Sequence, residues 1–436
     1  MKWLKWQKPE IKKDNEVLVQ VKAVGICGTD LHIFHDGRAD VTLPRIMGHE
    51  LSGLVKEVGK NVTNVKVGDR VVLDPVFACN TCDICKAGHP NVCSDVKCYG
   101  VQMDGGYCDY IVVEDYHLYP FDPSITYEQA ALAEPFSIGV NIVNRTMTSE
   151  HDTVVVIGSG TIGLCILQAA KGVGAKVLVS DVVDEKLAKA KEMGADVIVN
   201  SAKENLAEAV EKFSPGGASV VIDAVGIAPL TEQAVDLTCP TGRVAVIGFD
   251  AKPAQIPPVK ITKKELTLVG SRMNCHQFPK VVEWLNEGKI NADLMISRTY
   301  PVEEIQKAFE DTIANGKDIV KTLITFLEGF EGAVVGKVSF NNNWKFLLGN
   351  EPGAHLLEYD DASWRNVQIP HDWSVEKDFD PVEGEACTAF LTGGVGWYRK
   401  KFRTTEEMRD QKVYIVFDGI YNRSTVYVNG EKVKFH

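Results

Sequence analysis

The sequence lacks the apolar runs, basic runs and export signal that mark membrane, nucleic-acid-binding and secreted proteins. No stretch approaches the roughly 20 apolar residues that a transmembrane helix needs. The first residues, MKWLKWQKPEIKK, carry charge but no apolar segment of the kind found in secretory signals. No long Lys/Arg run occurs, and the formal net charge is −12. These absences predict a cytoplasmic protein without a membrane or nucleic-acid partner.

The eleven cysteines therefore stand in a sequence without an export signal. In a reducing compartment disulfides are disfavoured, so clustered cysteines are expected to bind metal. The chain has 436 residues. At a prior of roughly 150 residues per domain, that length predicts two to four domains.

Three compositional regimes follow one another along the chain. From about residue 15 to 120, runs such as VLVQVKAVG and LSGLVKEVG predict an all-β region of short strands. From about 151 to 270, apolar runs such as VVVIG, KVLVSD and SVVIDAVG alternate with helical patterns, including GLCILQAAKGVGA. Buried strands that alternate with helices predict a parallel, doubly wound sheet.

The remaining sequence predicts a return, a linker and a further β unit. Residues 274–326 hold two helical patterns and a strand-like VKTLITF that could return to the first region. EGFEGAVVGK is typical of a linker. After Lys337, WYRKKF, KVYIVFDGI and STVYVNGEKV read as strands, the last with an Asn-Gly turn signal. This part predicts a separate β-sandwich-like piece.

Four cysteines lie close together in the first region, spaced C-x2-C-x2-C-x7-C. They are Cys79, Cys82, Cys85 and Cys93. Four thiolates can surround one Zn²⁺ tetrahedrally, and the closed shell leaves no open position, so a structural zinc site is predicted. An iron–sulfur cluster could also use four cysteines. A disulfide pair does not suit the predicted compartment.

A second set of potential ligands flanks the four-cysteine loop. Cys27 occurs in GICGTDLH, His49 and Glu50 in MGHE, and Glu134 in ALAEPF. One Cys, one His and one or two carboxylates could make a catalytic zinc site, which needs three protein ligands and an exchangeable position. Each residue alone is more often an ordinary core or surface group, so the prediction depends on their joint presence. Whether Glu50 or Glu134 is the third ligand stays open.

Two polar residues follow Cys27 closely. The hydroxyl of Thr29 and the imidazole of His32 could relay a proton from a zinc-bound alcohol to solvent. The alternative for Thr29 is a local turn hydrogen bond.

A glycine-rich turn follows the strand VVVI and opens a helical pattern. Its residues are Gly158, Gly160, Thr161, Ile162 and Gly163. Such a turn lets the backbone approach a pyrophosphate at a helix N-terminus. Asp181 ends the next strand, where an acid meets the adenosine ribose hydroxyls and repels a 2′-phosphate. NAD is therefore predicted over NADP. Lys186 could also touch the ribose, although a solvated helix lysine is an equal alternative.

Together these motifs resemble those of the zinc-containing medium-chain alcohol dehydrogenases, over about residues 1–326. GICGTDLH, PRIMGHELSGLVKEVG, the four-cysteine loop, EPF and GSGTIG stand in that family's order. The polyol, threonine and sugar-acid branch, including L-galactonate dehydrogenases, is the most similar. The resemblance implies a GroES-like β-barrel domain at 1–145, a Rossmann domain at 146–273 and a return to the first domain at 274–327, with the active site in the cleft between the two domains.

The resemblance also implies roles for individual residues. It implies that Cys27, His49 and Glu134 surround the catalytic zinc, with Glu50 as an alternating ligand or a neighbour of the ligands. Thr29 and His32 would match the family's proton relay. Ser271 and Arg272 would lie near the nicotinamide or the substrate, where an arginine suits a carboxylate or polyol hydroxyls.

The tail carries a second resemblance. After a linker at 328–338, residues 339–436 resemble the N-terminal sugar-binding jelly-roll domain of family 2 glycoside hydrolases, in motifs such as FNNNWKFLLGN and GGVGWYRKKF. The chain stops inside that domain, and the carboxylate pair of a glycosidase is absent. No glycosidase activity is expected from this truncated domain.

The expected protein is thus an α/β Rossmann domain with a GroES-like barrel and a partial jelly roll. It would use two zinc ions and NAD to oxidise a secondary alcohol of a polyol or sugar acid to a ketone. Alternatives are a threonine or diol dehydrogenase, or a hybrid chain whose tail recruits a saccharide without catalysis. A small-molecule substrate and, by analogy with the family, a homo-oligomer are expected.

Overall fold

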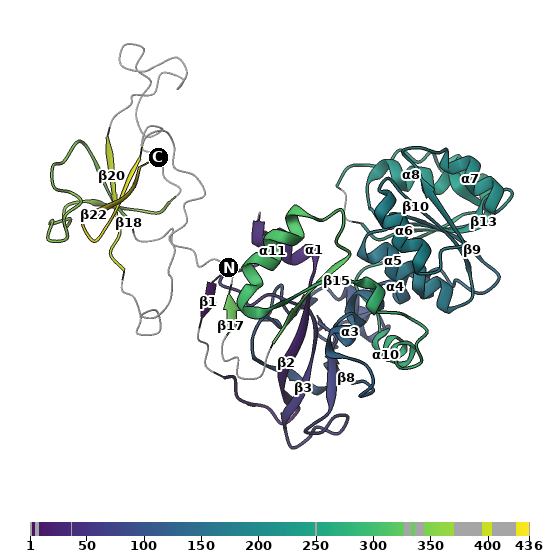
Figure 1. Ribbon diagram of the computed structural model, residues 1–436, viewed down its shortest axis with the longest axis horizontal. Helices are drawn as coiled ribbons and strands as arrows, with labels where there is room; N and C mark the ends of the chain where they lie inside the picture. Colours follow the sequence, from purple (N-terminus) through teal and green to yellow (C-terminus); the bar gives the residue numbers. More distant parts are fainter. Residues whose placement is uncertain are drawn as a thin grey trace, which may run out of the picture. The chain divides into compact units, whose positions relative to one another are not determined.

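The computed structural model describes residues 2–4, 8–35, 37–248, 251–326, 333–335, 344–369, 395–402 and 424–435. The chain divides into two compact units, residues 1–337 and 338–436 (Figure 1). Most of the linker predicted at 328–338 and the strand predicted from KVYIVFDGI lie outside the described residues. Within the described ranges, no helix combines the length and the apolar character required to cross a bilayer.

A six-stranded parallel sheet forms the centre of the second sequence regime. In sheet order its strands are β11 (Val197–Asn200), β10 (Lys176–Asp181), β9 (Thr153–Ile157), β12 (Ala218–Asp223), β13 (Thr238–Val246) and β14 (Thr267–Gly270). The strand order reverses between β9 and β12. Ligands of doubly wound sheets bind beyond the carboxyl ends of the strands at such a reversal.

Helices pack on both faces of this sheet, as the apolar runs predicted. Alternate residues of β9 belong to different core clusters: Val154 and Val156 to one, Val155 and Ile157 to the other. Figure 1 shows helices α5, α6 and α8 in teal around the strands. The helices of this part are α5 (Thr161–Gly172), α6 (Asp184–Glu192), α7 (Leu206–Phe213), α8 (Ala228–Leu237) and α9 (Pro258–Lys264). The prediction of a doubly wound sheet is confirmed.

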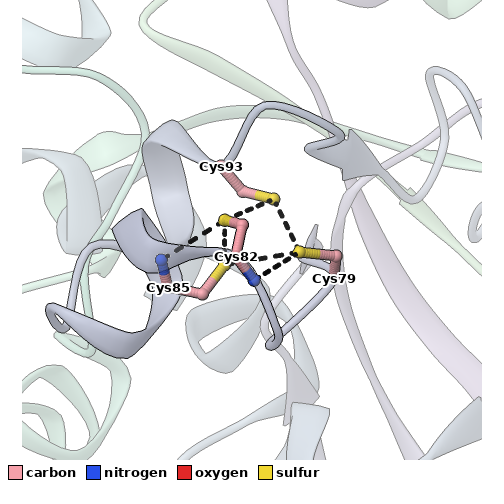
Figure 2. Close-up of side chains that lie close together, drawn as sticks. All are labelled: Cys79, Cys82, Cys85 and Cys93. Carbon is pink, nitrogen blue, oxygen red and sulfur yellow. Dashed lines mark hydrogen bonds between the residues drawn. The ribbon is translucent and has the colours of Figure 1, made fainter.

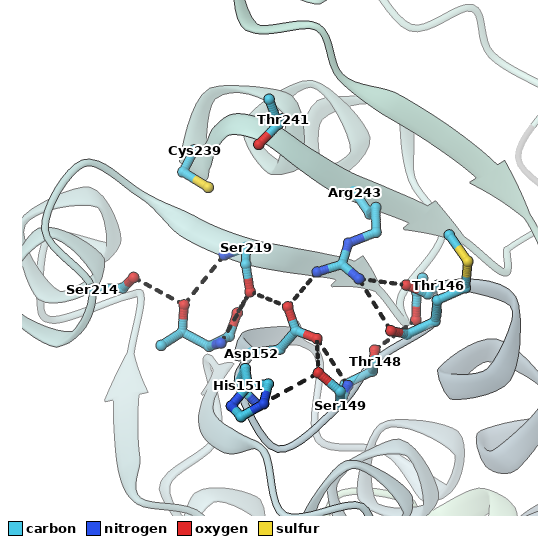
Figure 3. Close-up of polar contacts among 12 residues, drawn as sticks. Thr146, Thr148, Ser149, His151, Asp152, Ser214, Ser219, Cys239, Thr241 and Arg243 are labelled. Atoms are coloured by element: carbon cyan, nitrogen blue, oxygen red, sulfur yellow. Dashed lines mark hydrogen bonds and ion pairs between the residues drawn. The ribbon is translucent and has the colours of Figure 1, made fainter.

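A network of polar side chains joins the amino ends of β9, β12 and β13, opposite the expected ligand edge (Figure 3). Asp152 forms an ion pair with Arg243 and accepts hydrogen bonds from Ser219 (2.7 Å) and Ser149 (3.1 Å). The Arg243 guanidinium also donates to the Thr146 carbonyl at 2.9 Å. Each of these buried or half-buried groups has a hydrogen-bond or ion-pair partner. The network therefore holds the amino ends of the three strands in position.

The first regime forms a seven-stranded, mostly antiparallel sheet. In order its strands are β15 (Ile296–Pro301), β16 (Lys321–Thr325), β2 (Glu16–Ile26), β3 (Glu50–Val58), β4 (Arg70–Leu73) and β8 (Leu118–Pro120), with β7 (Tyr110–Glu114) also paired to β2. The strand predicted from VKTLITF is β16, and it pairs antiparallel with β2. The chain therefore returns to this sheet after the parallel one. Its core is one apolar cluster that includes Val17, Val19 and Val21.

The region that the sequence predicted as all-β also contains a helix, α1 (Gly28–His35). The carboxylate of Asp30 accepts the backbone N–H of Cys27 at 2.9 Å, which satisfies a donor at the start of the helix. Ile33 is buried and joins the core. The expectation failed because the short GICGTDLH segment looks like a turn between strands.

Shorter elements connect these parts. They are β5 (Val76–Phe77), α2 (Asp83–Lys86), η1 (Pro90–Val92), β6 (Lys97–Cys98), η2 (Asp115–His117), α3 (Tyr127–Ala131), α4 (Ala133–Arg145), α10 (Phe278–Asn286), η3 (Asp293–Met295), η4 (Val302–Glu304) and α11 (Ile305–Ala314). Strand β1 (Lys2–Leu4) pairs separately with β17 (Ala333–Val335). Helix α4 packs against α5 and so links the two sheets.

The second unit contains two small sheets among its described residues. Strand β18 (Trp344–Leu348) lies between β19 (Arg365–Val367) and β20 (Gly396–Arg399), and β21 (Thr425–Val428) pairs with β22 (Glu431–Phe435). Asn429 and Gly430 have φ values of 52° and 85°, so the predicted Asn-Gly hairpin turn is confirmed. The jelly roll itself stays a prediction.

Candidate metal and cofactor sites

The four cysteines predicted to bind one metal converge in a single loop (Figure 2). Sγ–Sγ distances between pairs of them are 3.4 Å for Cys82–Cys85 and for Cys79–Cys93, 3.8 Å for Cys82–Cys93, and 3.9 Å for Cys79–Cys85. Sulfurs about 2.3 Å from a tetrahedral zinc ion are about 3.8 Å apart. The residues present therefore fit zinc.

Backbone N–H groups of the loop donate hydrogen bonds to its sulfur atoms. The Cys79 Sγ accepts the N–H of Cys82 at 3.3 Å, and the Cys93 Sγ accepts the N–H of Asp95 at 3.4 Å. Hydrogen bonds from Thr81 and Cys82 lower the pKa of Cys79 to about 5. Because only thiolates bind zinc strongly, the lowered pKa of Cys79 favours metal binding, whereas burial raises the pKa of Cys85.

The second constellation also converges, but with one of the two candidate carboxylates. Ligand atoms of Cys27, His49 and Glu50 lie within 4.8 Å of one another. Cys27 precedes α1, and the other two residues stand at the start of β3. Glu134, in the first turn of α4, is outside this group. It is buried, and its charge raises the pKa of Cys98, which the charge of His49 lowers. Burial raises the pKa of Glu134 to about 7.

A buried aspartate that the sequence analysis missed supports this constellation. Asp30 accepts the N–H groups of Cys27 (2.9 Å) and Gly48 (3.2 Å) and the hydroxyl of Tyr107 (3.3 Å). Its Oδ1 lies 3.8 Å from the His49 Nδ1. This separation is too long for a hydrogen bond, so the two groups interact through charge alone. The only signal in the sequence was its position three residues after Cys27.

A buried lysine that was also missed completes the surroundings. The Lys321 Nζ lies 2.7 Å from the Glu50 Oε1 and 3.2 Å from the Ile26 carbonyl oxygen. Glu50 is 1% exposed, and its Oε2 has no hydrogen-bond partner in the described structure. A buried carboxylate oxygen without a partner is costly unless it binds a ligand. The donor set Cys–His–carboxylate would therefore fit a zinc ion.

The glycine turn has the geometry that a dinucleotide requires. Gly158 has φ +100°, and a Cβ there would lie 2.6 Å from Val225. A Cβ on Gly163 would lie 1.9 Å from the Gly158 carbonyl oxygen. Gly160 instead faces open space just before α5, which begins at Thr161. Two glycines are thus needed by the turn, and the third leaves room for a phosphate at the helix N-terminus.

Asp181 ends β10 beside this turn. Its Oδ2 accepts the N–H (2.7 Å) and hydroxyl (2.8 Å) of Ser159, and its Oδ1 accepts the N–H groups of Val182 (2.7 Å) and Val183 (3.0 Å). Although burial opposes it, these hydrogen bonds lower the pKa of Asp181 below its usual value. The carboxylate is therefore ionised and fixed in place. Lys186 is half-buried on α6, two residues into the helix.

Comparisons with known proteins agree with this geometry. Residues 13–123 match the alcohol dehydrogenase GroES-like domain, and residues 161–287 match the zinc-binding dehydrogenase domain. D-arabitol-phosphate dehydrogenase from Enterococcus avium is 37% identical over 70% of this chain and 89% of its own. L-galactonate-5-dehydrogenase from Escherichia coli K12 is 35% identical over 74% and 96%.

A crystal structure of the alcohol dehydrogenase RspB from Escherichia coli CFT073 with NADH is also similar. It is 36% identical, with a TM-score of 0.69, over 73% of this chain and 94% of its own. The chain belongs to the zinc-type medium-chain alcohol dehydrogenases. It is a zinc-dependent, NAD-linked oxidoreductase with a GroES-like and a Rossmann-type domain. The matched domains lie within residues 13–287, so the glycoside hydrolase resemblance of the tail stays a prediction.

The structure of the dehydrogenase places the predicted relay residues on one helix. Thr29 and His32 both lie on α1, three residues apart, so they share a face of the helix. Thr29 is half-buried next to Cys27, and His32 is exposed. The proton relay through these two residues stays a prediction.

The two residues predicted near the nicotinamide follow β14 directly. The Ser271 hydroxyl is buried and lies 3.0 Å from the Asn141 Nδ2, which donates to it. Arg272 is exposed, and its guanidinium makes no hydrogen bond or ion pair within the described part of the dehydrogenase. It is therefore available for a ligand beyond the carboxyl end of β14.

Proposed function

We propose that this dehydrogenase oxidises a secondary alcohol of a sugar acid or polyol to a ketone, with NAD as the acceptor. The observation that carries the proposal is the convergence of ligand atoms of Cys27, His49 and Glu50, together with a buried Glu50 oxygen that has no hydrogen-bond partner among the described residues. When bound, the zinc ion supplies a Lewis acid for the substrate hydroxyl, and NAD supplies the hydride acceptor.

Glu50 is the third protein ligand of this proposed site. It belongs to the convergent group, whereas Glu134 does not. Lys321 occupies Oε1 and leaves Oε2 for the metal. The Asp30 Oδ1 lies 3.8 Å from the His49 Nδ1, close enough for a charge interaction but not for a hydrogen bond. The remaining position is left for the substrate oxygen, as catalytic zinc sites require.

The hydroxyl proton leaves through two groups of α1. Thr29 receives it near Cys27, and His32 delivers it to solvent one helical turn away. The hydroxyl of Thr29 can donate and accept at once, which a relay needs.

The proposed cofactor preference comes from Asp181. Its ionised carboxylate accepts ribose hydroxyls and repels a 2′-phosphate, so NAD is preferred over NADP. Lys186, in the first turn of α6, is a further candidate for contact with the same ribose. Both residues act through charge at the adenosine end.

Arg272 favours a substrate with a carboxylate. An exposed, unpaired guanidinium can bind a carboxylate with two parallel hydrogen bonds. A relative that is 35% identical acts, by its name, on L-galactonate, which carries this group. We therefore rank sugar acids above neutral polyols.

A substrate screen with the full chain tests the proposal. NADH formation is measured with L-galactonate, sorbitol and L-threonine in zinc-containing buffer, with NAD and with NADP. We expect oxidation of L-galactonate with NAD to have the highest kcat/KM. No oxidation of any sugar acid or polyol would overturn the proposal, and a preference for threonine would overturn the substrate class.

A pair of matched variants tests the ligand assignment. Glu50→Gln should lower bound zinc from about two ions per chain to about one and abolish activity. Glu134→Gln should keep both ions. The reverse outcome would assign Glu134 as the ligand.

A further inference from the structure

The segment Ser271–Cys275 is held by polar contacts that come from outside it. Asn141 of α4 donates to the Ser271 hydroxyl (3.0 Å) and to the Met273 carbonyl (3.3 Å). The Asn274 side chain donates to the Asp74 carboxylate at 3.1 Å. Asn141 belongs to α4, the helix that packs against α5, and Asp74 directly follows β4 of the antiparallel sheet.

The four-cysteine loop supplies two further anchors. The Asn91 Nδ2 donates to the Arg272 carbonyl at 2.8 Å, and the Cys275 Sγ donates to the Gly88 carbonyl at 3.1 Å. Gly88 and Asn91 both lie between the ligand positions Cys85 and Cys93. Asn91 is 5% exposed. Its amide is therefore committed to this contact and not to water.

The backbone of this segment needs such anchors. Met273 has φ +52° and His276 has φ +57°, values in the left-handed region that non-glycine residues seldom adopt. Conformations of this kind persist only where surrounding contacts enforce them, and they concentrate at functional sites. Two such residues between Ser271 and His276 indicate that contacts with other elements determine the backbone path of the segment.

The same segment is anchored near Glu134, a buried carboxyl group close enough to His49 and Glu50 for their charges to influence its pKa. Asn141 stands seven residues after Glu134 on α4, two turns along the same face and about 10 Å away. The carboxylate of Asp74, which holds Asn274, is close enough to Glu134 to influence its pKa. Arg272 therefore lies on a segment anchored on one side near Glu134, whose pKa the charges of His49 and Glu50 also influence, and on the other side to the four-cysteine loop.

We propose that Asn91 is a positioning residue that lets the four-cysteine loop fix Arg272 in the substrate site. The loop then contributes to substrate binding as well as to folding. This inference rests on the proposed function for one step only, the contact of Arg272 with the substrate.

Kinetics of Asn91→Ala against a matched control give the first test. Asn64 also donates an amide N–H to a carbonyl, that of Asp115 at 2.8 Å, and it has no contact with residues 271–275. Asn91→Ala should raise KM for L-galactonate about fivefold to tenfold, the worth of one such hydrogen bond. The kcat should change less than about twofold, because the reacting groups are untouched. Asn64→Ala should change neither.

A double-mutant cycle separates positioning from a general structural effect. Arg272→Ala alone should raise KM more than Asn91→Ala does. In the Arg272→Ala background, Asn91→Ala should raise KM no further, because Asn91 acts through Arg272. Independent, multiplicative effects would overturn the proposal, and so would an unchanged KM in Asn91→Ala.

Hydrogen exchange provides a readout that does not depend on activity. Amides of residues 270–276 should exchange faster in Asn91→Ala than in the wild type or in Asn64→Ala. If exchange accelerates but no sugar acid or polyol is oxidised by the wild type, the anchor stands and the proposed function fails. If the wild type is active and exchange in Asn91→Ala is unchanged, only the anchor fails.

Discussion

The two metal constellations of this dehydrogenase are built in opposite ways. The four cysteines lie within fifteen residues, on a loop whose own backbone N–H groups prepare the sulfurs. Cys27, His49 and Glu50 depend instead on Lys321, which pairs with Glu50 across 271 residues of sequence. The first site is a property of a short segment, and the second is a property of the assembled fold. A substitution at one site should therefore affect metal binding and stability differently from a substitution at the other.

The largest effect should come from the buried lysine of the assembled site. Lys321→Met removes the partner of a carboxylate that is 1% exposed, and an uncompensated buried charge costs about 3 to 5 kcal/mol. Zinc affinity or activity should also fall about 10-fold to 100-fold. Chemical unfolding and steady-state kinetics measure the two effects.

An exposed lysine pair is the control for this variant. Lys289 lies 2.8 Å from Glu287, and both side chains are about half exposed. Lys289→Met should change stability by less than about 1 kcal/mol. If both variants changed the free energy of unfolding by the same small amount, the buried ion pair would contribute no more to stability than the surface pair.

The predicted cofactor site is a third case, in which Asp181 is held by nearby residues of the glycine turn and of its own segment. Asp181→Ala removes the ribose acceptor, so KM for NAD should rise about 30-fold while KM for NADP falls, because the repulsion of the 2′-phosphate is gone. The control is Asp184→Ala, at a position three residues after Asp181. It removes the exposed ion-pair partner of Lys203. If the two variants gave the same NAD/NADP ratio, Asp181 would not set the preference.

A ligand of the four-cysteine loop should have a smaller but selective effect. Cys93→Ser should remove about one zinc ion per chain and leave the other in place. Because Asn91 lies two residues before Cys93, KM for the sugar acid should rise about as much as in Asn91→Ala, fivefold to tenfold. Metal analysis and kinetics on the same sample check this. Complete loss of both metals would show that the two sites are not independent.

The smallest expected effect is on acid stability, at the junction of the four-cysteine loop and the barrel. His117 stacks on Phe77, and its Nδ1 lies 2.9 Å from the Asp74 carbonyl oxygen. Burial lowers the pKa of His117 to about 4. The unfolded chain therefore binds a proton near pH 6.5 that the folded chain refuses, and stability is lost as the pH falls from about 6.5 toward 4.

His117→Gln removes this titration and keeps an amide donor for Asp74. Between pH 6.5 and 5 the variant should lose between about 1 and 2 kcal/mol less stability than the wild type. Denaturant unfolding at the two pH values measures the difference, in which shared titrations cancel. Parallel pH curves for the two proteins would mean that His117 does not set the acid sensitivity.

The sequence allowed the prediction of sites whose groups lie within one short segment. It did not allow the prediction of groups that only the fold brings together. The cysteine spacing and the glycine turn could be predicted because each places its groups within one short segment. Asp30 and Lys321 could not, because their importance comes from burial next to His49 and Glu50, which only the folded sheet creates. For the same reason the sequence could not favour either Glu50 or Glu134, and the proposal of Glu50 comes from its place beside Cys27 and His49 in the structure.

The most direct test of the central claim combines zinc content with L-galactonate oxidation in Cys27→Ser. The account predicts that this variant keeps the zinc of the four-cysteine loop, about one ion per chain, and loses all oxidation. Oxidation at the wild-type rate with only that ion bound would contradict it, because the metal held by Cys27, His49 and Glu50 would then not be the one that works on the substrate.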